Sequence, residues 1–337
     1  MTLQAPATVP VAFVRGMLLG VQARGEACEP YLAEAGIQEE LLGHAGARVT
    51  AAQYAQLFKI LIERRADEGV GFLSRPIKPG SFALMARYGM GAPNVELAMR
   101  RVAEAFSLLQ DDFTLITRQD GGQAALALVP NEACAAQPVF WHEMLLRVLW
   151  RLIAWLAGGR LPATRFDFAF AAPPHVAGYS KIFPAPLAFG CAESAVWFDA
   201  GCLRSPVQRD ELALRAFLAN AQTNIVLPQL GSDVVSTRVR HHLLRTQPAW
   251  PDLGATAEAL CMSTATLQRK LALEGTSFQA LKDALRRDIA ILHLSASSMP
   301  MAALAQDLGF TDSAAFQRAF KGWTGSAPGA YRRKSGL

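Results

Sequence analysis

The chain has 337 residues, a length that favours two domains, and 51% of them are apolar, which excludes wholesale disorder. From Asp233 to the end there are 13 Lys and Arg against 8 Asp and Glu, whereas the first 232 residues hold 20 of each kind. A neutral N-terminal part followed by a basic C-terminal part predicts that only the latter meets a polyanion.

The cysteines and the hydropathy of the chain indicate in which cellular compartment the protein is expected. The chain has five cysteines: Cys28, Cys134, Cys191, Cys202 and Cys261. They are scattered, odd in number and without a CxxC pair, which predicts a reduced cytoplasmic protein with buried thiols. We expect no metal site and no cofactor. Arg15 interrupts the apolar N-terminal stretch and no cleavage motif follows it, so we expect no signal peptide. The most apolar region, 139–157, contains four ionisable residues and predicts a mostly buried helix rather than a membrane span.

The first 227 residues mix helical and strand patterns. Apolar residues spaced by three and four predict helices over 13–23, 28–36, 51–65, 94–110, 138–157 and 211–225, with a short helix at 175–182. Strands are expected over 81–88, 113–117, 124–129, 165–170, 187–189 and 195–198, with a hairpin turn at Asp120-Gly121-Gly122. This mixture predicts an α+β domain over residues 1–227.

Residues 228–337 show helical patterns only and are expected to form an all-α domain. Helices are predicted over 233–246, over 255–260, from a cap at Ser263, over 278–294, up to Gly309, and from a cap at Thr311 or Asp312. Two of the resulting helix pairs are joined by tight turns. We therefore predict helix-turn-helix units at about 255–274 and about 302–324.

The two helix-turn-helix units read as internal copies. LQRKL, which begins at Leu267, matches FQRAF, which begins at Phe316, at an offset of 49 residues. An offset of 48 residues, which implies one extra residue in the second turn, relates Ala257 to Ala305, Leu260 to Leu308 and Met262 to Phe310. The long helix between the copies could hold two recognition helices about one DNA turn, roughly 34 Å, apart.

The outward face of each recognition helix predicts DNA contacts. Base reading is expected from Ala265, Gln268, Arg269, Ser313, Ala314, Gln317 and Arg318. The equivalent Arg269 and Arg318 could pair with guanine O6 and N7, with a discrimination of about 1–3 kcal/mol for each contact. Phosphate contacts are expected from Lys270, Arg286, Arg287, Lys321, Arg332 and Arg333.

The segment over 307–333, DLGFTDSAAFQRAFKGWTGSAPGAYRR, resembles the C-terminal signature of the AraC/XylS transcription regulators. PGSFALMARY, ELAMRRVAEAFSLL and HVAGYSKIFPAPLAFGCAESAVWFDAGCLRSP resemble the ligand-binding domain of the subgroup with ornithine- and arginine-responsive regulators. No His-containing motif of the cupin-type arabinose sensor is found. The resemblance implies a regulator that binds double-stranded promoter DNA and a small-molecule effector, forms a homodimer and, as an activator, contacts RNA polymerase. Ala265 and Gly322 depart from the family pattern, in which larger or basic side chains are common.

No catalytic motif is found, so the sequence predicts a protein that is not an enzyme. Aromatic bulk combined with a few polar groups suggests an effector pocket made of Arg87, Tyr88, Trp141, His142, Arg147 and Trp150. Three alternatives stay open: an N-terminal domain that senses a protein partner, an effector-independent architectural DNA binder, and an enzyme that uses its helical domain only for localisation.

Overall fold

The structure is a computed structural model that describes residues 7–131, 138–159, 161–219, 221, 225 and 235–332. The chain forms two compact units. We call Ala12–Ala35 together with Ala55–Pro228 the N-terminal unit, and Met1–Val11, Gly36–Tyr54 and Gln229–Leu337 together the C-terminal unit. The predicted domain boundary between residues 227 and 228 lies outside the described residues and stays a prediction.

The N-terminal unit is built on a five-stranded sheet with the order β3-β4-β7-β5-β6. The strands are β3 (Phe113–Asp120), β4 (Gln123–Pro130), β5 (Arg165–Phe168), β6 (Leu187–Phe189) and β7 (Ser194–Asp199). All neighbours are antiparallel except β5 and β6, which run parallel. Leu126 and Leu128 lie on one face of β4, where they pair with Val196 and Leu115. The hairpin predicted around Gly121 is confirmed, because β3 and β4 pair up to Asp120 and Gln123.

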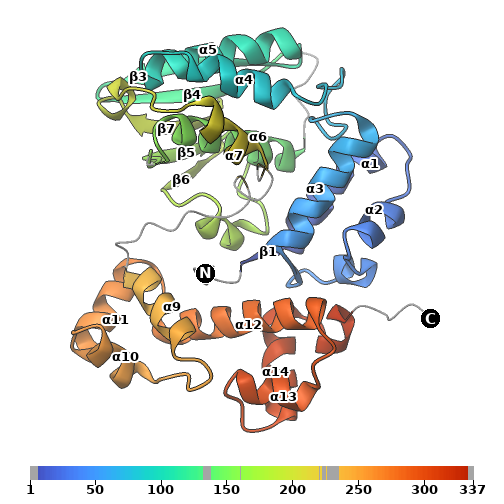
Figure 1. The fold of residues 1–337 in the computed structure, drawn as a ribbon, viewed down its shortest axis with the longest axis vertical. Helices are drawn as coiled ribbons and strands as arrows, with labels where there is room; N and C mark the ends of the chain where they lie inside the picture. The colour runs from blue at the N-terminus through green and yellow to red at the C-terminus, as the bar shows by residue number, and fades with distance from the viewer. Residues whose placement is uncertain are drawn as a thin grey trace. The chain divides into compact units, whose positions relative to one another are not determined.

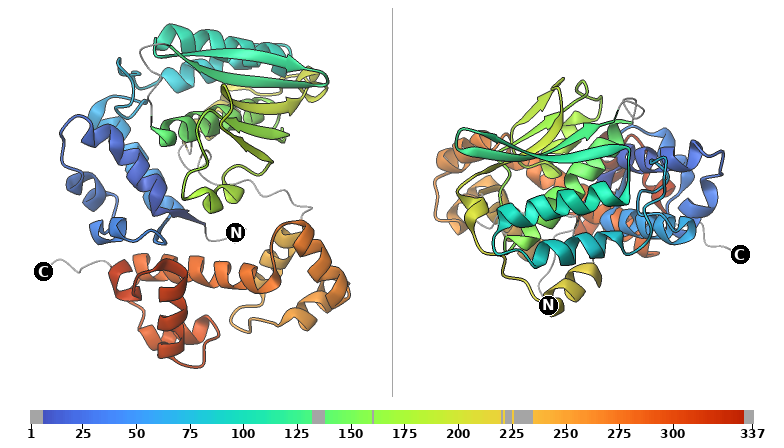
Figure 2. Two further views of the ribbon diagram at one scale, coloured as in Figure 1. Left: turned by 180° about the vertical axis from the view of Figure 1, so that it is seen from behind. Right: turned by 90° about the horizontal axis from the view of Figure 1, so that it is seen from above.

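Helices complete the α+β architecture that the sequence predicts. They are α1 (Val11–Gln22), α2 (Glu29–Glu34), α3 (Ala51–Arg65), α4 (Ser81–Met90), α5 (Val95–Leu109), α6 (Val139–Leu156) and α7 (Glu211–Ala219). Short 3₁₀ turns of this unit are η3 (Val176–Lys181) and η4 (Cys202–Arg204), whereas η1 (Glu39–Gly43) belongs to the C-terminal unit. Figures 1 and 2 show α5 beside the β3–β4 hairpin. In α6, 15 of 18 residues are buried, which makes it the central core helix of the unit, as predicted.

The predicted strand over 81–88 is wrong, because this segment forms α4. Its buried residues Ser81, Met85 and Gly89 recur every four positions, which is a helical period. A short apolar run fits a strand and a helix equally, and the helix prevails here because it packs on α5 and α6. A side chain at Gly89 would place a carbon 3.0 Å from Leu156 and 3.1 Å from Val102. Glycine therefore allows this close packing.

The C-terminal unit combines a small ribbon with helices. The ribbon consists of β1 (Thr8–Pro10) and the antiparallel β2 (Arg48–Thr50). The helices are α9 (Val235–Arg245), α10 (Leu253–Ala259), α11 (Thr264–Leu273), α12 (Phe278–Ala296), α13 (Met301–Asp307) and α14 (Ser313–Thr324), followed by the 3₁₀ turn η5 (Pro328–Tyr331). Within this unit, Figure 1 shows α9, α10 and α11 at one end of α12 and α13 and α14 toward the other end. The all-α prediction is confirmed for the described residues after 234.

Candidate nucleic-acid interface and effector pocket

The first helix-turn-helix unit consists of α10, a tight turn and α11. The turn reverses at Cys261, whose φ is 57°, and the N–H of Met262 donates to the carbonyl of Ala257 at 2.9 Å. The Ser263 hydroxyl then caps α11, because it accepts a hydrogen bond from the N–H of Thr266 at 3.2 Å. The turn predicted through Cys261 and the cap predicted at Ser263 are confirmed.

The second unit repeats this geometry with α13 and α14. Gly309 takes the left-handed position with a φ of 71°, and the N–H of Phe310 donates to the carbonyl of Ala305 at 2.9 Å. Asp312 caps α14 by accepting from the N–H of Ala315 at 2.7 Å. Three steps separate the left-handed residue from the cap here and two in the first unit. The predicted duplication and the extra residue of the second turn are therefore confirmed.

Each recognition helix buries one face and exposes the other. Leu267 and Leu271 of α11, and Phe316 and Phe320 of α14, are buried. On the other side, the predicted base-reading residues Ala265, Gln268, Arg269, Ala314, Gln317 and Arg318 are exposed. Ser313 is half-buried, and its hydroxyl accepts a hydrogen bond from the side chain of Gln317 at 3.3 Å. The structure thus brings these side chains to two comparable surfaces, while their role in reading bases stays a prediction.

Trp250 connects the two helix-turn-helix units inside the C-terminal unit. It precedes α10, and its indole N–H donates to the carbonyl of Asp307, the last residue of α13, at 2.8 Å. The guanidinium of Arg286, from α12, lies 5.0 Å from the ring centre of Trp250 and 5.0 Å from that of Phe310. Because these contacts join the start of the first unit to the turn of the second, they restrain the spacing of α11 and α14.

The predicted phosphate contacts fall into two groups. Lys270 and Lys321 are exposed in the last turns of α11 and α14. Arg286 lies against the rings of Trp250 and Phe310. Arg287 forms an ion pair with Asp288 at 2.9 Å, and Arg332 donates to the carbonyl of Met299. Arg333 lies outside the described residues. Lys270 and Lys321 therefore suit a phosphate contact best, since the three described arginines already have partners within the unit.

A buried charge cluster joins α12 to the β1–β2 ribbon. Asp288 of α12 accepts a hydrogen bond from the hydroxyl of Thr8 at 2.7 Å. Arg48 donates from Nε to the same hydroxyl at 2.7 Å, and its backbone N–H donates to the phenol of Tyr331 at 3.1 Å. Burial lowers the pKa of Arg48 to about 10. Thr8 and Arg48 thus belong to the same compact unit as the recognition helices. Their position near the beginning of the chain gives no indication of this.

The structure does not gather the six residues that the sequence suggests as an effector pocket. Arg87 and Tyr88 lie on exposed positions of α4. Arg87 forms an ion pair with Glu211 at 2.7 Å, and the Tyr88 hydroxyl donates to Glu104 at 3.2 Å. Neither side chain lines the cavity described below.

The other four suggested residues belong to the buried helix α6. Nδ1 of His142 is 3.2 Å from the Ser194 hydroxyl, and burial lowers the pKa of His142. Arg147 donates to the carbonyl of Ile225 at 2.7 Å, and burial lowers its pKa to about 9. The indole of Trp150 donates to a backbone carbonyl at 3.1 Å. These three side chains thus connect α6 to neighbouring segments through hydrogen-bond contacts, whereas the fourth, Trp141, lines the cavity.

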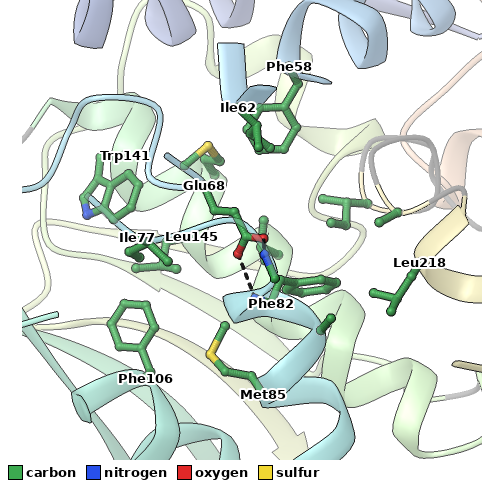
Figure 3. Close-up of a pocket in the computed structure, with 16 residues that line it drawn as sticks. Phe58, Ile62, Glu68, Ile77, Phe82, Met85, Phe106, Trp141, Leu145 and Leu218 are labelled. Carbon is green, nitrogen blue, oxygen red and sulfur yellow. Dashed lines mark hydrogen bonds between the residues drawn. The ribbon is translucent and has the colours of Figure 1, made fainter. Parts of the chain in front are cut away.

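A cavity of about 290 Å³ lies within the N-terminal unit. Its walls come from α3, α4, α5, α6, the segment around Ile77 and the described residues at and after the end of α7. Aromatic side chains contribute much of the lining: Phe58, Phe82, Phe106 and Trp141 (Figure 3). Apart from Trp141, sequence reasoning missed this set, because no local pattern relates residues as far apart as Phe58 and Ile225. The apolar stripes that contain them look identical to ordinary core positions.

The described part of the chain offers little for metal or membrane chemistry. In residues 7–131, 138–159, 161–219 and 235–332, no three His, Cys, Asp or Glu side chains are grouped as metal ligands. No helix in these ranges is both long enough and apolar enough to cross a bilayer. Cys191, Cys202 and Cys261 are not in disulfides. The prediction of buried thiols is wrong for these three, because Cys202 and Cys261 are exposed and Cys191 is half-buried.

Two family profiles match the chain. The profile described as the arabinose-binding domain of AraC transcription regulators, N-terminal, matches residues 25–207. The profile described as a helix-turn-helix domain matches residues 256–334. The second match therefore includes both turns and both recognition helices described above.

The chain is also similar in sequence to several transcriptional regulators. The chain is 26% identical over 326 residues to the ornithine utilization regulator of Pseudomonas aeruginosa, with 96% of each chain covered. It is 32% identical over 149 residues to an uncharacterized HTH-type transcriptional regulator of Mycobacterium tuberculosis, covering 44% of this chain and 43% of that protein. The solved structure of the transcriptional regulator CdpR from Pseudomonas aeruginosa covers 95% of this chain and 97% of that chain, with 18% identity and a TM-score of 0.34. A TM-score this low carries no further argument.

Proposed function

Because this chain belongs to the AraC family of transcription regulators, we propose that it recognises two boxes of promoter DNA, one through α11 and one through α14. The observation that carries this proposal is the pair of matched helix-turn-helix units, each with an exposed Gln-Arg pair on its second helix. The pairs are Gln268 with Arg269 and Gln317 with Arg318.

The connector helix supports recognition of two boxes on one face of the duplex. α12 has 19 residues, which corresponds to a length of about 28 Å. Successive major grooves on one face of B-DNA are roughly 34 Å apart. The contacts of Trp250 link the residue before α10 to the end of α13, through Asp307, and to the middle of α12, through Arg286. They support presentation of the two helices to DNA as one preformed surface.

The chemistry of the exposed faces assigns different roles to their residues. Arg269 and Arg318 read guanine by donating to O6 and N7, and Gln268 and Gln317 read adenine. Ala265, Ser313 and Ala314 provide close apolar or hydroxyl contacts to base edges. Lys270 and Lys321 pair with phosphates and set register rather than sequence.

The N-terminal unit supplies regulation in this proposal. Its largely apolar cavity of about 290 Å³ supports a small-molecule effector over a protein partner, since a protein would be met by a broad exposed patch rather than by a concave site. The effector favours whichever arrangement of a homodimer fits the half-sites, because a ligand shifts an equilibrium only through different affinities for the two states. The protein then acts in the cytoplasm, where the chromosome lies, and an activator would also contact RNA polymerase.

Selection from a pool of random duplexes tests the proposal. The full chain should enrich a two-box motif with a spacing of about one DNA turn. Arg269→Ala should lose base preference in one box and Arg318→Ala in the other, by about 1–3 kcal/mol at the affected position.

A charge-matched control separates base reading from general attraction. Arg245→Ala removes one positive charge from an exposed position at the end of α9 and should leave both boxes unchanged. If all three variants weaken binding evenly and no motif is enriched, the arginines contact phosphate only, and an architectural DNA binder would be the better description.

A further inference from the structure

The effector cavity contains one ionisable side chain among otherwise apolar walls. Among the 16 lining residues that the structure describes, Glu68 alone carries a carboxyl group, and none is Lys, Arg or His. A volume of about 290 Å³ is at the lower end of the range for small-molecule sites, about 300–1,000 Å³. The walls thus suit a compact ligand with a single polar group.

Glu68 is held in place by the start of α4. Its two carboxylate oxygens accept hydrogen bonds from the backbone N–H groups of Gly80 and Phe82, each at 2.7 Å. Figure 3 shows this carboxyl group beside Phe82, in the middle of the lining side chains. Burial raises the pKa of the Glu68 carboxyl, against the opposing effect of the two N–H groups. A carboxylate in this position gains from a cation, because its own surroundings do not fully compensate its burial.

The same walls disfavour two other ligand classes. A sugar would bring several hydroxyl groups against Phe58, Phe106 and Trp141, and each buried hydroxyl without a partner weakens binding. An amino acid would bring a carboxylate that finds no basic side chain among the lining residues and is repelled by Glu68. Aromatic walls instead match an aromatic ring or an alkyl chain.

We propose that this cavity takes an apolar molecule with one amino group, whose ammonium pairs with the Glu68 carboxylate while its ring or chain packs against Phe58, Phe82 and Phe106. This inference rests on the proposed effector-responsive function and names the chemical class of the effector. An ammonium at Glu68 also competes for the oxygens that hold Gly80 and Phe82, so the ligand acts directly on the beginning of α4.

Three probes with the same carbon skeleton test the class: phenylbutylamine, phenylbutanol and phenylbutyrate, titrated calorimetrically into the full chain. The amine should bind about tenfold or more tighter than the alcohol, as for a charge-assisted hydrogen bond, and the acid should bind most weakly. Glu68→Gln should abolish the difference between amine and alcohol and retain alcohol binding. Glu63→Gln, at an exposed position of α3, is the matched control and should behave as the wild type.

A second variant keeps the inference testable if Glu68→Gln disturbs α4. Met144→Trp places a larger side chain in the cavity wall and should weaken all three probes at least about tenfold, as expected when the ligand's volume is filled. Equal affinity for amine and acid, an amine preference that persists in Glu68→Gln, or unchanged binding in Met144→Trp would each overturn the inference.

The outcome is separable from that of the proposed function. If the two-box DNA motif is selected but the amine is not preferred, the effector class is wrong and the regulator stands. If the amine is preferred but no motif is selected, the cavity chemistry is right and the DNA proposal fails.

Discussion

Replacing Asp288 by Asn should destabilise α12 and its contact with the β1–β2 ribbon. The carboxyl group of Asp288 is buried and lies 2.9 Å from a guanidinium nitrogen of Arg287. Its charge also acts on Arg48 and Arg240, whose pKa values burial lowers. Asn preserves the shape and an acceptor for Thr8 but leaves these arginines without their anion.

The expected magnitude follows from the burial of the pair. Breaking a fully buried ion pair on one side destabilises a protein by about 3–5 kcal/mol. The Arg287 side chain keeps 17% of its exposure, against 3% for Asp288, so water compensates part of the loss. We therefore expect the free energy of local unfolding of α12 to decrease by about 2–4 kcal/mol.

Hydrogen exchange measured on peptides from 278–296 is the suitable assay, because a chain with two units need not unfold in one step. A loss of about 2–4 kcal/mol corresponds to a decrease in protection of roughly 30-fold to 900-fold. Thr8→Val, which removes the hydroxyl that donates to Asp288, should reduce protection in the same peptides by less.

A substitution one turn away controls for the loss of charge itself. Asp283 of α12 is partly exposed and accepts a hydrogen bond from the side chain of Gln279 at 2.9 Å. Asp283→Asn should change protection by less than about fivefold, the effect of a surface interaction. Equal losses of protection in Asp283→Asn and Asp288→Asn would refute the reasoning, since burial would then make no difference.

Three further substitutions test the turn of the second helix-turn-helix unit, the recognition helix α14 and the core of the N-terminal unit. Gly309→Ala should lower the melting temperature, with a loss of about 1–2 kcal/mol, because φ is 71° and the added carbon would lie 2.8 Å from Trp250. Gly322→Ala in α14, with open space around it, should stabilise by about 0.5–1 kcal/mol, and a loss there would contradict the comparison. Burial lowers the pKa of His142 in the folded protein. Below about pH 6.5 the unfolded chain therefore binds a proton at this imidazole more readily than the folded chain does. Stability to urea should therefore fall as the pH decreases from about 7.5 to 5.5, and a slope that is unchanged in His142→Asn would show that another group titrates.

The helix-turn-helix region was predictable nearly to the residue. A glycine at 309, a capping Asp312 and aromatic residues at spacings of three and four impose a turn and a helix through local rules. Internal repetition added a second, independent check, which the matching hydrogen bonds of Met262 and Phe310 confirm. Exposure of Arg269 and Arg318 followed from the same helical period.

Local rules were insufficient where partners distant in sequence decide the outcome. The strand expected over 81–88 became a helix because its neighbours α5 and α6 accommodate a helix there. Arg286 and Arg332 were predicted as phosphate contacts, yet the ring of Trp250 lies against the first and the carbonyl of Met299 accepts a hydrogen bond from the second. Charge alone does not distinguish a solvated arginine from one held by the core.

Helical period and capping residues predicted the helix-turn-helix units and the exposed faces of their recognition helices, because each depends on residues within a few turns of one another. The regulator family was indicated by the resemblance of whole motifs, such as the segment over 307–333. The cavity in the N-terminal unit and the buried cluster at Asp288 depend on which segments meet in space. Phe58 and Trp141, or Thr8 and Asp288, come together only after the chain has folded, because burial and electrostatic partners are properties of the packed interior rather than of neighbours in sequence.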